Sequence, residues 1–318
     1  MKTAVVLAAG KGTRMQSELP KVMHTILSET MVEHVLSNLN TIRVDQTVVV
    51  VGHGAELVQA CLKDSVAYAI QSEQLGTGHA VMQSLPLLPI EGDSLILYGD
   101  TPCIQAETMA NLYEVNKDAD LTVLTAIFED PARYGRIVRN AVGDIEKIVE
   151  YKDCTDEQKL IKEINTGIYC VKNKVLHEYL AMIKNDNAAK EYYLTDLIEI
   201  GLNHGLNMQA IPVEDVNEVM GVNDRVDLAK ASQWIQQTIN QKWMRKGVTM
   251  VNPDQTYISL STELDADVTL YPNVYLEKKS KIGKGTVVLP NSFIVNSTIG
   301  ENCKIDSSRI TDSIVKNK

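Results

Sequence analysis

Short runs of Val, Ile and Leu alternate with segments of helical periodicity over the first 225 residues. Each run is short enough, and apolar enough on both faces, to be a buried strand. The predicted strands are Thr3–Leu7, Thr47–Val51, Val66–Ile70, Ser94–Tyr98 and Leu121–Ile127. Helices are predicted near residues 31–39, 54–62, 78–84 and 105–117. Strand–helix alternation predicts an α/β fold with a parallel sheet that helices cover on both faces.

The order of elements changes after residue 130. The segments Arg136–Arg139 and Ile145–Tyr151 flank Ala-Val-Gly-Asp and predict a hairpin, and Ile164–Val171 and Met208–Val213 predict two further strands. Residues 225–246 contain neither Gly nor Pro and carry apolar side chains at steps of three and four. This spacing predicts one long helix that ends at Gly247.

Beyond this helix the apolar pattern has a period of six. The aliphatic positions are Ile258, Leu264, Leu270, Leu276, Ile282, Val288 and Ile294. Four residues after each stands a small or β-branched residue: Thr262, Val268, Val274, Ser280, Thr286, Ser292 and Thr298. The double phase predicts a three-sided parallel coil with aliphatic residues at its inner corners. We therefore expect three parts: a domain over 1–225, a linker helix over 226–247 and a partial coil over 248–318.

Charge and cysteine spacing restrict the function classes. The chain has 31 basic and 41 acidic residues, a net charge of -10, which argues against binding of nucleic acid or an anionic membrane surface. No apolar run is long enough to insert into a membrane. The five cysteines are widely spaced, without the close pairs of a zinc or dithiol site. We expect a cytoplasmic protein, because unpaired cysteines suit a reducing compartment.

A loop suited to phosphates follows the first predicted strand. Small residues at Ala8, Ala9, Gly10 and Gly12 let backbone N–H groups approach an anion, and Arg14 and Lys21 add two positive charges. A dinucleotide-binding fingerprint would need glycine where Met15 stands, and the Walker spacing is missing as well. An ordinary strand–helix turn is the alternative interpretation of the glycines.

Two further clusters carry candidate chemistry. Gln71, before Gly76 and Gly78, offers an amide donor and acceptor suited to the edge of a base. Asp100 follows the fourth predicted strand, where ligands of open α/β sheets bind and a carboxylate can hold Mg²⁺. The alternatives are helix caps, with Thr77 or Asp100 as the capping residue.

Together these stretches resemble one family. LAAGKGTRM with LPKVMH, QLGTGHA, LYGDTP, YGRIV, IVEYKD, INTGIY and EVMGVNDR occur in the order found in the nucleotidyltransferase half of the bacterial bifunctional N-acetylglucosamine-1-phosphate uridyltransferase and glucosamine-1-phosphate acetyltransferase. The resemblance covers residues ~1–230, and the hexads resemble the start of that family's β-helix. It implies a Rossmann-like nucleotidyltransferase domain with a short left-handed parallel β-helix of hexapeptide repeats.

The resemblance also implies roles for individual residues. It makes Arg14 and Lys21 catalytic, holding the triphosphate and stabilising the leaving pyrophosphate. It assigns Leu7, Ala8, Ala9 and Gly10 to the uridine, Gln71 and Gly76 to uracil, and Tyr98, Gly99 and Asp100 to the ribose and metal region. Asp100 and Asn223 would be the Mg²⁺ ligands, and Thr77, Gly135, Glu150 and Asn165 would bind the N-acetylglucosamine part. By themselves, Gly135 and Asn165 would be interpreted as turn residues.

The implied reaction joins UTP and N-acetylglucosamine 1-phosphate to give UDP-N-acetylglucosamine, a cell-wall precursor, and pyrophosphate. The family's coils assemble as homotrimers, and its acetyltransferase site lies in later coils that these 318 residues lack, so we expect no acetyltransferase activity from them. Three alternatives stay open: another sugar-1-phosphate nucleotidyltransferase, a catalytically silent subunit that binds a nucleotide sugar, and a protein that serves mainly as a trimer scaffold.

Overall fold

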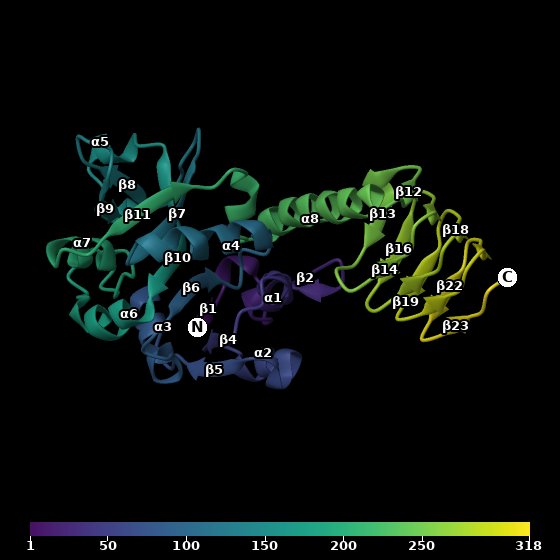
Figure 1. Ribbon diagram of the computed structural model, residues 1–318, viewed down its shortest axis with the longest axis horizontal. Helices are drawn as coiled ribbons and strands as arrows, with labels where there is room; N and C mark the ends of the chain where they lie inside the picture. The colour runs from purple at the N-terminus through teal and green to yellow at the C-terminus, as the bar shows by residue number, and fades with distance from the viewer. The chain divides into compact units, whose positions relative to one another are not determined.

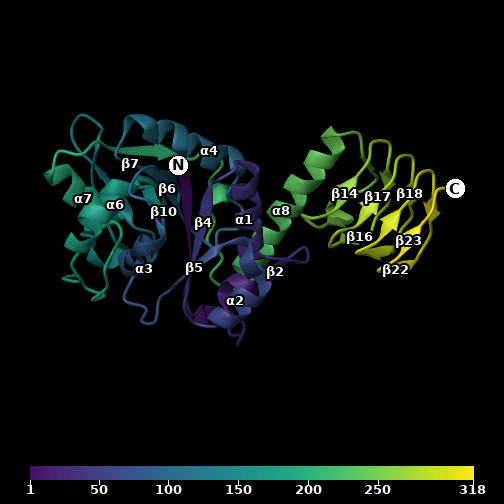
Figure 2. The same cartoon turned by 60° about the horizontal axis from the view of Figure 1, so that its bottom comes forward.

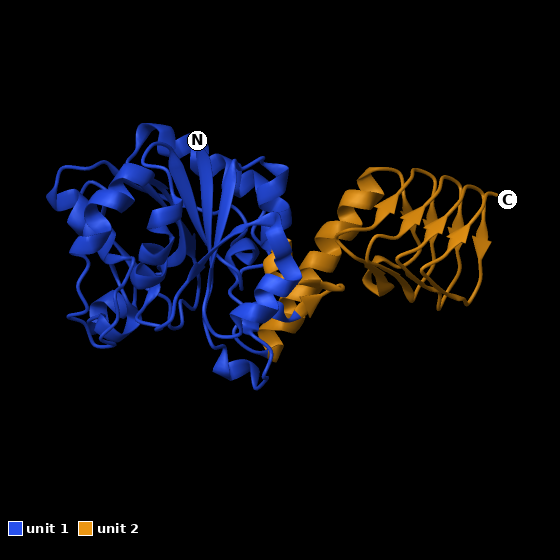
Figure 3. Cartoon of the chain, turned by 90° about the horizontal axis from the view of Figure 1, so that it is seen from below, with its two compact units in different colours: residues 1–24, 35–224 blue, residues 25–34, 225–318 orange.

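The computed structural model describes residues 1–318 and divides them into two compact units (Figure 3). The first unit, the α/β unit, consists of residues 1–24 and 35–224. The second, the repeat unit, consists of residues 25–34 and 225–318. The sequence had grouped residues 25–34 with the preceding segment, because nothing in their pattern distinguishes them. None of the helices combines the length and the apolar character that crossing a membrane requires.

The α/β unit is built on a nine-stranded sheet (Figure 1). Its strands are β1 (Lys2–Ala8), β4 (Gln46–Val51), β5 (Ala67–Ile70), β6 (Asp93–Tyr98), β7 (Leu121–Ile127), β8 (Arg136–Arg139), β9 (Ile145–Val149), β10 (Glu163–Lys172) and β11 (Met208–Pro212). The main order is β11-β7-β10-β6-β1-β4-β5, and β8 and β9 attach beside β10. Strand β1 is parallel to both neighbours, β4 and β6, as predicted.

The five strands predicted before residue 130 run in one direction, whereas the sheet as a whole is mixed. Strand β10 runs antiparallel to both β6 and β7. The preceding elements explain the reversal: β8 and β9 form the predicted antiparallel hairpin, and Ile164 of β10 pairs with Arg136 of β8. The chain therefore enters β10 from a neighbouring hairpin rather than through the long crossover that a parallel strand requires.

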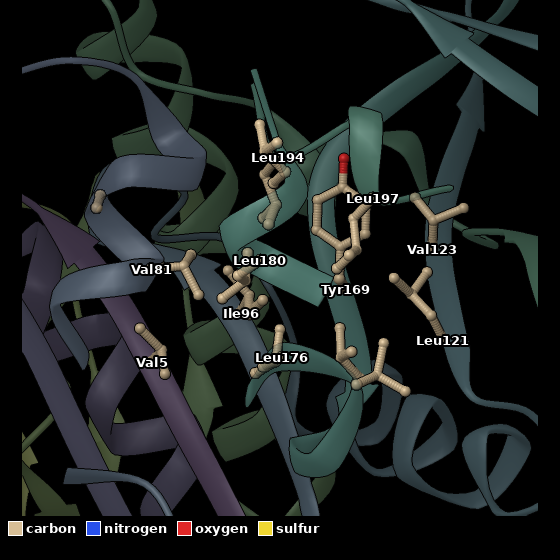
Figure 4. Packing of buried hydrophobic residues seen from close by; sticks show 14 of the residues in the cluster. Val5, Val81, Ile96, Leu121, Val123, Tyr169, Leu176, Leu180, Leu194 and Leu197 are labelled. Atoms are coloured by element: carbon tan, nitrogen blue, oxygen red, sulfur yellow. The ribbon is translucent and has the colours of Figure 1, made fainter. Parts of the chain in front are cut away.

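Helices cover the sheet and supply its core. They are α1 (Met31–Thr41, whose first turn up to His34 belongs to the repeat unit), α2 (Ala55–Leu62), α3 (Thr77–Ser84), α4 (Ala106–Val115), α5 (Asp156–Lys159), α6 (Asn173–Tyr179) and α7 (Asp196–Asn203). Consecutive residues of β1 are buried, so both faces of this strand are covered. Figure 4 shows one layer of this core, where Val5 and Ile96 of the sheet lie near Val81 of α3 and Leu176 of α6.

The repeat unit begins with β2 (Thr25–Ile26), β3 (Glu29–Thr30) and α8 (Arg225–Arg245). Helix α8 is followed by Gly247 with φ 92°, which confirms the predicted stop. The carboxylate of Glu29 accepts hydrogen bonds from the Leu260 and Ser261 backbone N–H groups at 3.2 and 3.3 Å. A short hairpin far away in the sequence is thus hydrogen-bonded to the first coil.

The coil consists of three four-stranded parallel sheets, whose short strands are visible in Figure 2. They are β12 (Thr249–Met250), β15 (Thr269–Leu270), β18 (Val287–Val288) and β21 (Lys304–Ile305); β13 (Thr256–Ile258), β16 (Val274–Glu277), β19 (Phe293–Val295) and β22 (Arg309–Thr311); and β14 (Glu263–Leu264), β17 (Lys281–Ile282), β20 (Thr298–Ile299) and β23 (Ile314–Val315). All seven predicted aliphatic positions are at most 7% exposed, which confirms the inner corners.

One predicted inner position is wrong. Thr298 is exposed, and Ser297 takes the buried place beside the aliphatic corner at 2% exposure. The register explains the change, because Tyr275 pairs with Phe293 whereas Lys281 already pairs with Thr298, one residue fewer along the chain. The coil therefore shortens by one residue between Val295 and Thr298.

Candidate active site

A cavity of about 300 Å³ lies at the carboxyl ends of β1 and β6. The predicted residues that line it are Leu7, Ala8, Ala9, Gly10, Lys21, Gln71, Gly76, Thr77, Tyr98 and Asp100. Leu7 and Tyr98 are register partners, and the Gly99 N–H donates to the Leu7 carbonyl at 2.9 Å. Because parallel strands end at the same edge, segments distant in sequence meet here.

The glycines of the first loop have different structural reasons. Gly10 has open space where a side chain would stand. Gly12 has φ 60°, and a Cβ there would lie 2.6 Å from the Cβ of Lys21. Gly12 therefore allows a left-handed turn and the close approach of the Lys21 backbone.

Both predicted cations have oxygen-bearing partners. Lys21 forms an ion pair with Asp100, with the two side chains 16% and 17% exposed. Arg14 donates through Nη2 to Oδ1 of Asn223 at 2.7 Å, at an exposed position. The Val222 N–H donates to the Asp100 carbonyl at 2.9 Å, so the segment that carries Asn223 is fastened to the end of β6.

Asp100 and Thr77 are not helix caps, so that alternative is wrong. The N-cap of α4 is Gln105, and the N-cap of α3 is Gly76, neither with a side-chain capping bond. Thr77 instead accepts from the Leu194 N–H at 3.1 Å. The side chains of Asp100 and Thr77 thus line the cavity and do not cap helices.

The amide of Gln71 is already oriented by its neighbours. Its Nε2 donates to the Gly76 carbonyl at 3.2 Å and lies 3.1 Å from Nδ1 of His79. The donor half of the predicted donor–acceptor pair is therefore used within the chain, and the carbonyl oxygen of the amide has no hydrogen-bond partner in the chain. Gly76, with φ 114°, adopts a backbone conformation that other residues rarely tolerate.

A second polar cluster lies beside Tyr98. The Asn165 N–H donates to the Gly135 carbonyl at 2.9 Å, and a Cβ at Gly135 would lie 3.3 Å from Oε1 of Glu150. Asn165 belongs to strand β10 and not to a turn, contrary to the simple interpretation of Asn-Thr-Gly. Burial, with the nearby carboxylates of Asp153, Asp196 and Glu191, raises the pKa of Glu150 to about 6.

The cavity and the predicted set of residues differ in both directions. Six predicted residues do not line the cavity: Arg14, Gly99, Gly135, Glu150, Asn165 and Asn223. Four lining residues were missed: Val22, Gln74, Ala80 and Glu191. Val22, Gln74 and Ala80 stand within motifs that the sequence singled out, so their neighbours were the available signal. Glu191 stands in a segment without such a motif.

Comparison with known proteins first defines the class of protein to which the chain belongs. Residues 3–244 match the family model described as "Nucleotidyl transferase", so the chain belongs to the nucleotidyl transferases. Two solved structures share the fold at low identity. HddC from Yersinia pseudotuberculosis is 20% identical with a TM-score of 0.56, covering 74% of this chain and all of that one. A putative glucose-1-phosphate thymidylyltransferase from Bacillus anthracis is 19% identical with a TM-score of 0.58, covering 73% and 94%.

Closer similarity identifies the particular family. The "Bifunctional protein GlmU" of Listeria monocytogenes serotype 4a is 47% identical over 315 residues, which is 98% of this chain and 69% of the relative. That of Pediococcus pentosaceus is 46% identical over 317 residues, 99% of this chain and 68% of the relative. The chain therefore belongs to the GlmU family and is a GlmU-like sugar-1-phosphate nucleotidyltransferase.

Proposed function

We propose that this protein is a uridyltransferase that converts UTP and N-acetylglucosamine 1-phosphate to UDP-N-acetylglucosamine and pyrophosphate. The observation that carries the proposal is the pairing of Lys21 with Asp100 and of Arg14 with Asn223 at the end of β6. Two cations and two oxygen-bearing side chains stand where a triphosphate and its counter-ion would meet.

The chemistry needs no general base. The nucleophile is a phosphate oxygen of the sugar phosphate, which is ionised at neutral pH. It forms a bond to the α-phosphorus of UTP while the bond from that phosphorus to the pyrophosphate oxygen breaks. Lys21 and Arg14 compensate the charge that gathers on the phosphate oxygens and hold the reacting groups in line. The lack of an activating Ser-His or Cys-His pair is consistent with this reaction.

Asp100 and Asn223 would hold Mg²⁺. Both offer oxygen, and the Asn223 amide is turned so that Nδ2 donates to the Gly221 carbonyl at 3.1 Å while Oδ1 faces Arg14. Two protein oxygens suit an ion that takes its remaining ligands from water and phosphates. Bound there, the ion would neutralise triphosphate charge.

We expect the uracil base and the sugar to be bound by different residues. The half of the Gln71 amide that makes no hydrogen bond within the chain is an acceptor, which matches the N–H of a uracil ring. Gly135, Glu150 and Asn165 would receive the acetamido sugar. We further propose that the product enters cell-wall synthesis and that the coil joins three copies of the chain.

Pyrophosphate release tests the proposal. The full chain is assayed with UTP and a panel of sugar 1-phosphates, with and without Mg²⁺, and again with other nucleoside triphosphates. The proposal predicts release with UTP and N-acetylglucosamine 1-phosphate that requires Mg²⁺. Preference for another sugar or nucleotide would contradict it in favour of a different nucleotidyltransferase, and no release with any pair would favour a silent binding subunit.

A further inference from the structure

Strand β10 carries an irregularity beside the polar cluster. Its pairing with β7 shifts register between Asn165 and Tyr169, so the strand bulges there. Gly167, inside the bulge, has φ 80°, and a side chain on it would overlap the Tyr98 ring. Bulges redirect side chains, and they are frequent next to active sites. Here the Gly167 N–H, inside the bulge, donates to the Asn165 side chain.

The bulge fixes which way round the Asn165 amide lies. Its Oδ1 is 2.9 Å from the Gly167 nitrogen and 3.0 Å from the Tyr169 hydroxyl. The Gly167 N–H can only donate, so the atom that faces it must be the oxygen of the amide. Because that oxygen only accepts, the Tyr169 hydroxyl donates to it.

The Tyr169 hydroxyl is a dependable donor. Its residue is 1% exposed and belongs to the apolar core, where Figure 4 shows its ring near Leu197 with the hydroxyl at the outer end. Burial raises the pKa of this hydroxyl well above its ordinary value, so it stays protonated. A buried hydroxyl without a partner is unfavourable, so the bond to Asn165 is strongly maintained.

The other end of the amide is left for a ligand. The Nδ2 atom of Asn165 donates to no atom of the chain. It is also not among the fully buried polar atoms that lack a hydrogen-bond partner, so part of its surface is accessible. The Asn165 backbone N–H donates to the Gly135 carbonyl, and a Cβ on Gly135 would lie 3.3 Å from Oε1 of Glu150. Asn165 and Glu150 therefore both neighbour Gly135.

We propose that Tyr169 is a positioning residue that commits Asn165 to donate a hydrogen bond to an acceptor oxygen of the sugar. This inference rests on the proposed function, which places the sugar beside Asn165. Tyr169 contacts no substrate in this account and acts only through the amide. Without its hydroxyl, the amide keeps one of its two anchors, and the orientation that offers Nδ2 is less strictly held.

Steady-state kinetics of Tyr169→Phe in the full chain test the inference. The change removes one hydroxyl and keeps the ring. We expect KM for the sugar 1-phosphate to rise about tenfold, as for the loss of about 1.4 kcal/mol of binding. KM for UTP should stay within about twofold. The split between the two substrates is a result that general loosening of the core would not give.

A matched control is available in Tyr113→Phe. Tyr113 is also buried, at 3%, and its hydroxyl donates to the Thr3 carbonyl, far from Asn165 in the chain. Its loss should lower the melting temperature and leave the sugar KM unchanged. Asn165→Asp is a second probe, because the carboxylate still accepts from Gly167 and Tyr169 but cannot donate; we expect a larger rise of the sugar KM.

The double variant Tyr169→Phe with Asn165→Ala decides the coupling. The inference predicts that Tyr169→Phe has no further effect on the sugar KM once the amide is absent. Three results would each overturn the inference. They are additive effects of the two changes on the sugar KM, a sugar KM in Tyr169→Phe equal to that in Tyr113→Phe, and an unchanged sugar KM in Asn165→Asp. If the unmodified protein preferred a different sugar 1-phosphate, the proposed function would be contradicted instead. The same variants would then be compared with that sugar 1-phosphate as substrate.

Discussion

In the repeat unit, the place of a residue in its hexad decides whether its side chain is buried, whereas in the α/β unit the site is assembled from residues far apart in the chain. Ile282 is an inner corner because it stands six residues after Leu276. Lys21 and Asp100 meet only because β1 and β6 end side by side. A one-dimensional repeat can be understood from spacing alone, while a strand-edge site depends on topology.

The largest expected effect tests the site of the α/β unit. Lys21→Ala removes the cation that pairs with Asp100, and we expect turnover to fall by about 10²–10³, as when one charge-stabilising group is lost. Circular dichroism should show the fold intact. Lys11→Ala, at an exposed position of the same loop, is the control and should remain near wild type. Wild-type turnover in the Lys21 variant would contradict the site.

The repeat side is tested by a corner residue. Ile282 is fully buried, so Ile282→Ala leaves a cavity and should lower the free energy of unfolding of the coil by about 2–5 kcal/mol. Urea unfolding measures this effect. Lys279→Ala, exposed in the same turn, should change it by less than ~0.5 kcal/mol. Equal effects of the two changes would mean that hexad position does not determine the core.

A smaller effect sharpens the role of backbone in the site. Gly12→Ala introduces a Cβ that crowds Lys21 at a left-handed position, and we expect kcat/KM to fall about tenfold. Gly143→Ala is the matched control, because Gly143 also has positive φ, 95°, but has open space around it. It should strain the hairpin by about 1 kcal/mol without changing kcat/KM. Similar kinetics in both variants would show that the contact with Lys21 does not matter.

The smallest effect concerns Glu150 and pH. Its pKa of about 6 lies above the ordinary 4.5, so the folded chain binds this proton more tightly than the unfolded chain. The protonated Glu150 carboxyl therefore stabilises the folded state at low pH, and this contribution to the free energy of unfolding is lost as pH rises from about 4.5 to 6. Glu150→Gln should raise Tm by roughly 2–4 °C above pH 6 and by nothing below pH 4.5.

The exposed Glu146 on the same hairpin provides the comparison for that experiment. Glu146→Gln should leave Tm unchanged at every pH. A Glu150→Gln variant that melts below wild type at pH 7.5 would contradict the conclusion that burial and nearby carboxylates disfavour the ionised form of Glu150.

The extent to which sequence predicted structure follows the same division. Hexad spacing located the seven aliphatic corners from Ile258 to Ile294, and it failed at Thr298 because residue types alone do not show on which side of Thr298 the coil shortens by one residue. In the α/β unit, strand and helix positions followed from periodicity, but the direction of β10 did not, since pairing partners are set by tertiary packing. The bulge that orients Asn165 was likewise not predicted, because it depends on Gly167 meeting a Tyr98 ring from another strand.

The most direct test of the central claim is the ratio of kcat/KM for N-acetylglucosamine 1-phosphate to that for glucose 1-phosphate, measured with UTP and Mg²⁺. The two sugars differ only in the group that the cluster of Gly135, Glu150 and Asn165 is proposed to read. We predict a ratio on the order of 10² or more, since a site built to hydrogen-bond a group discriminates strongly against an analogue that lacks it. A ratio near one, or a preference for glucose 1-phosphate, would contradict the account.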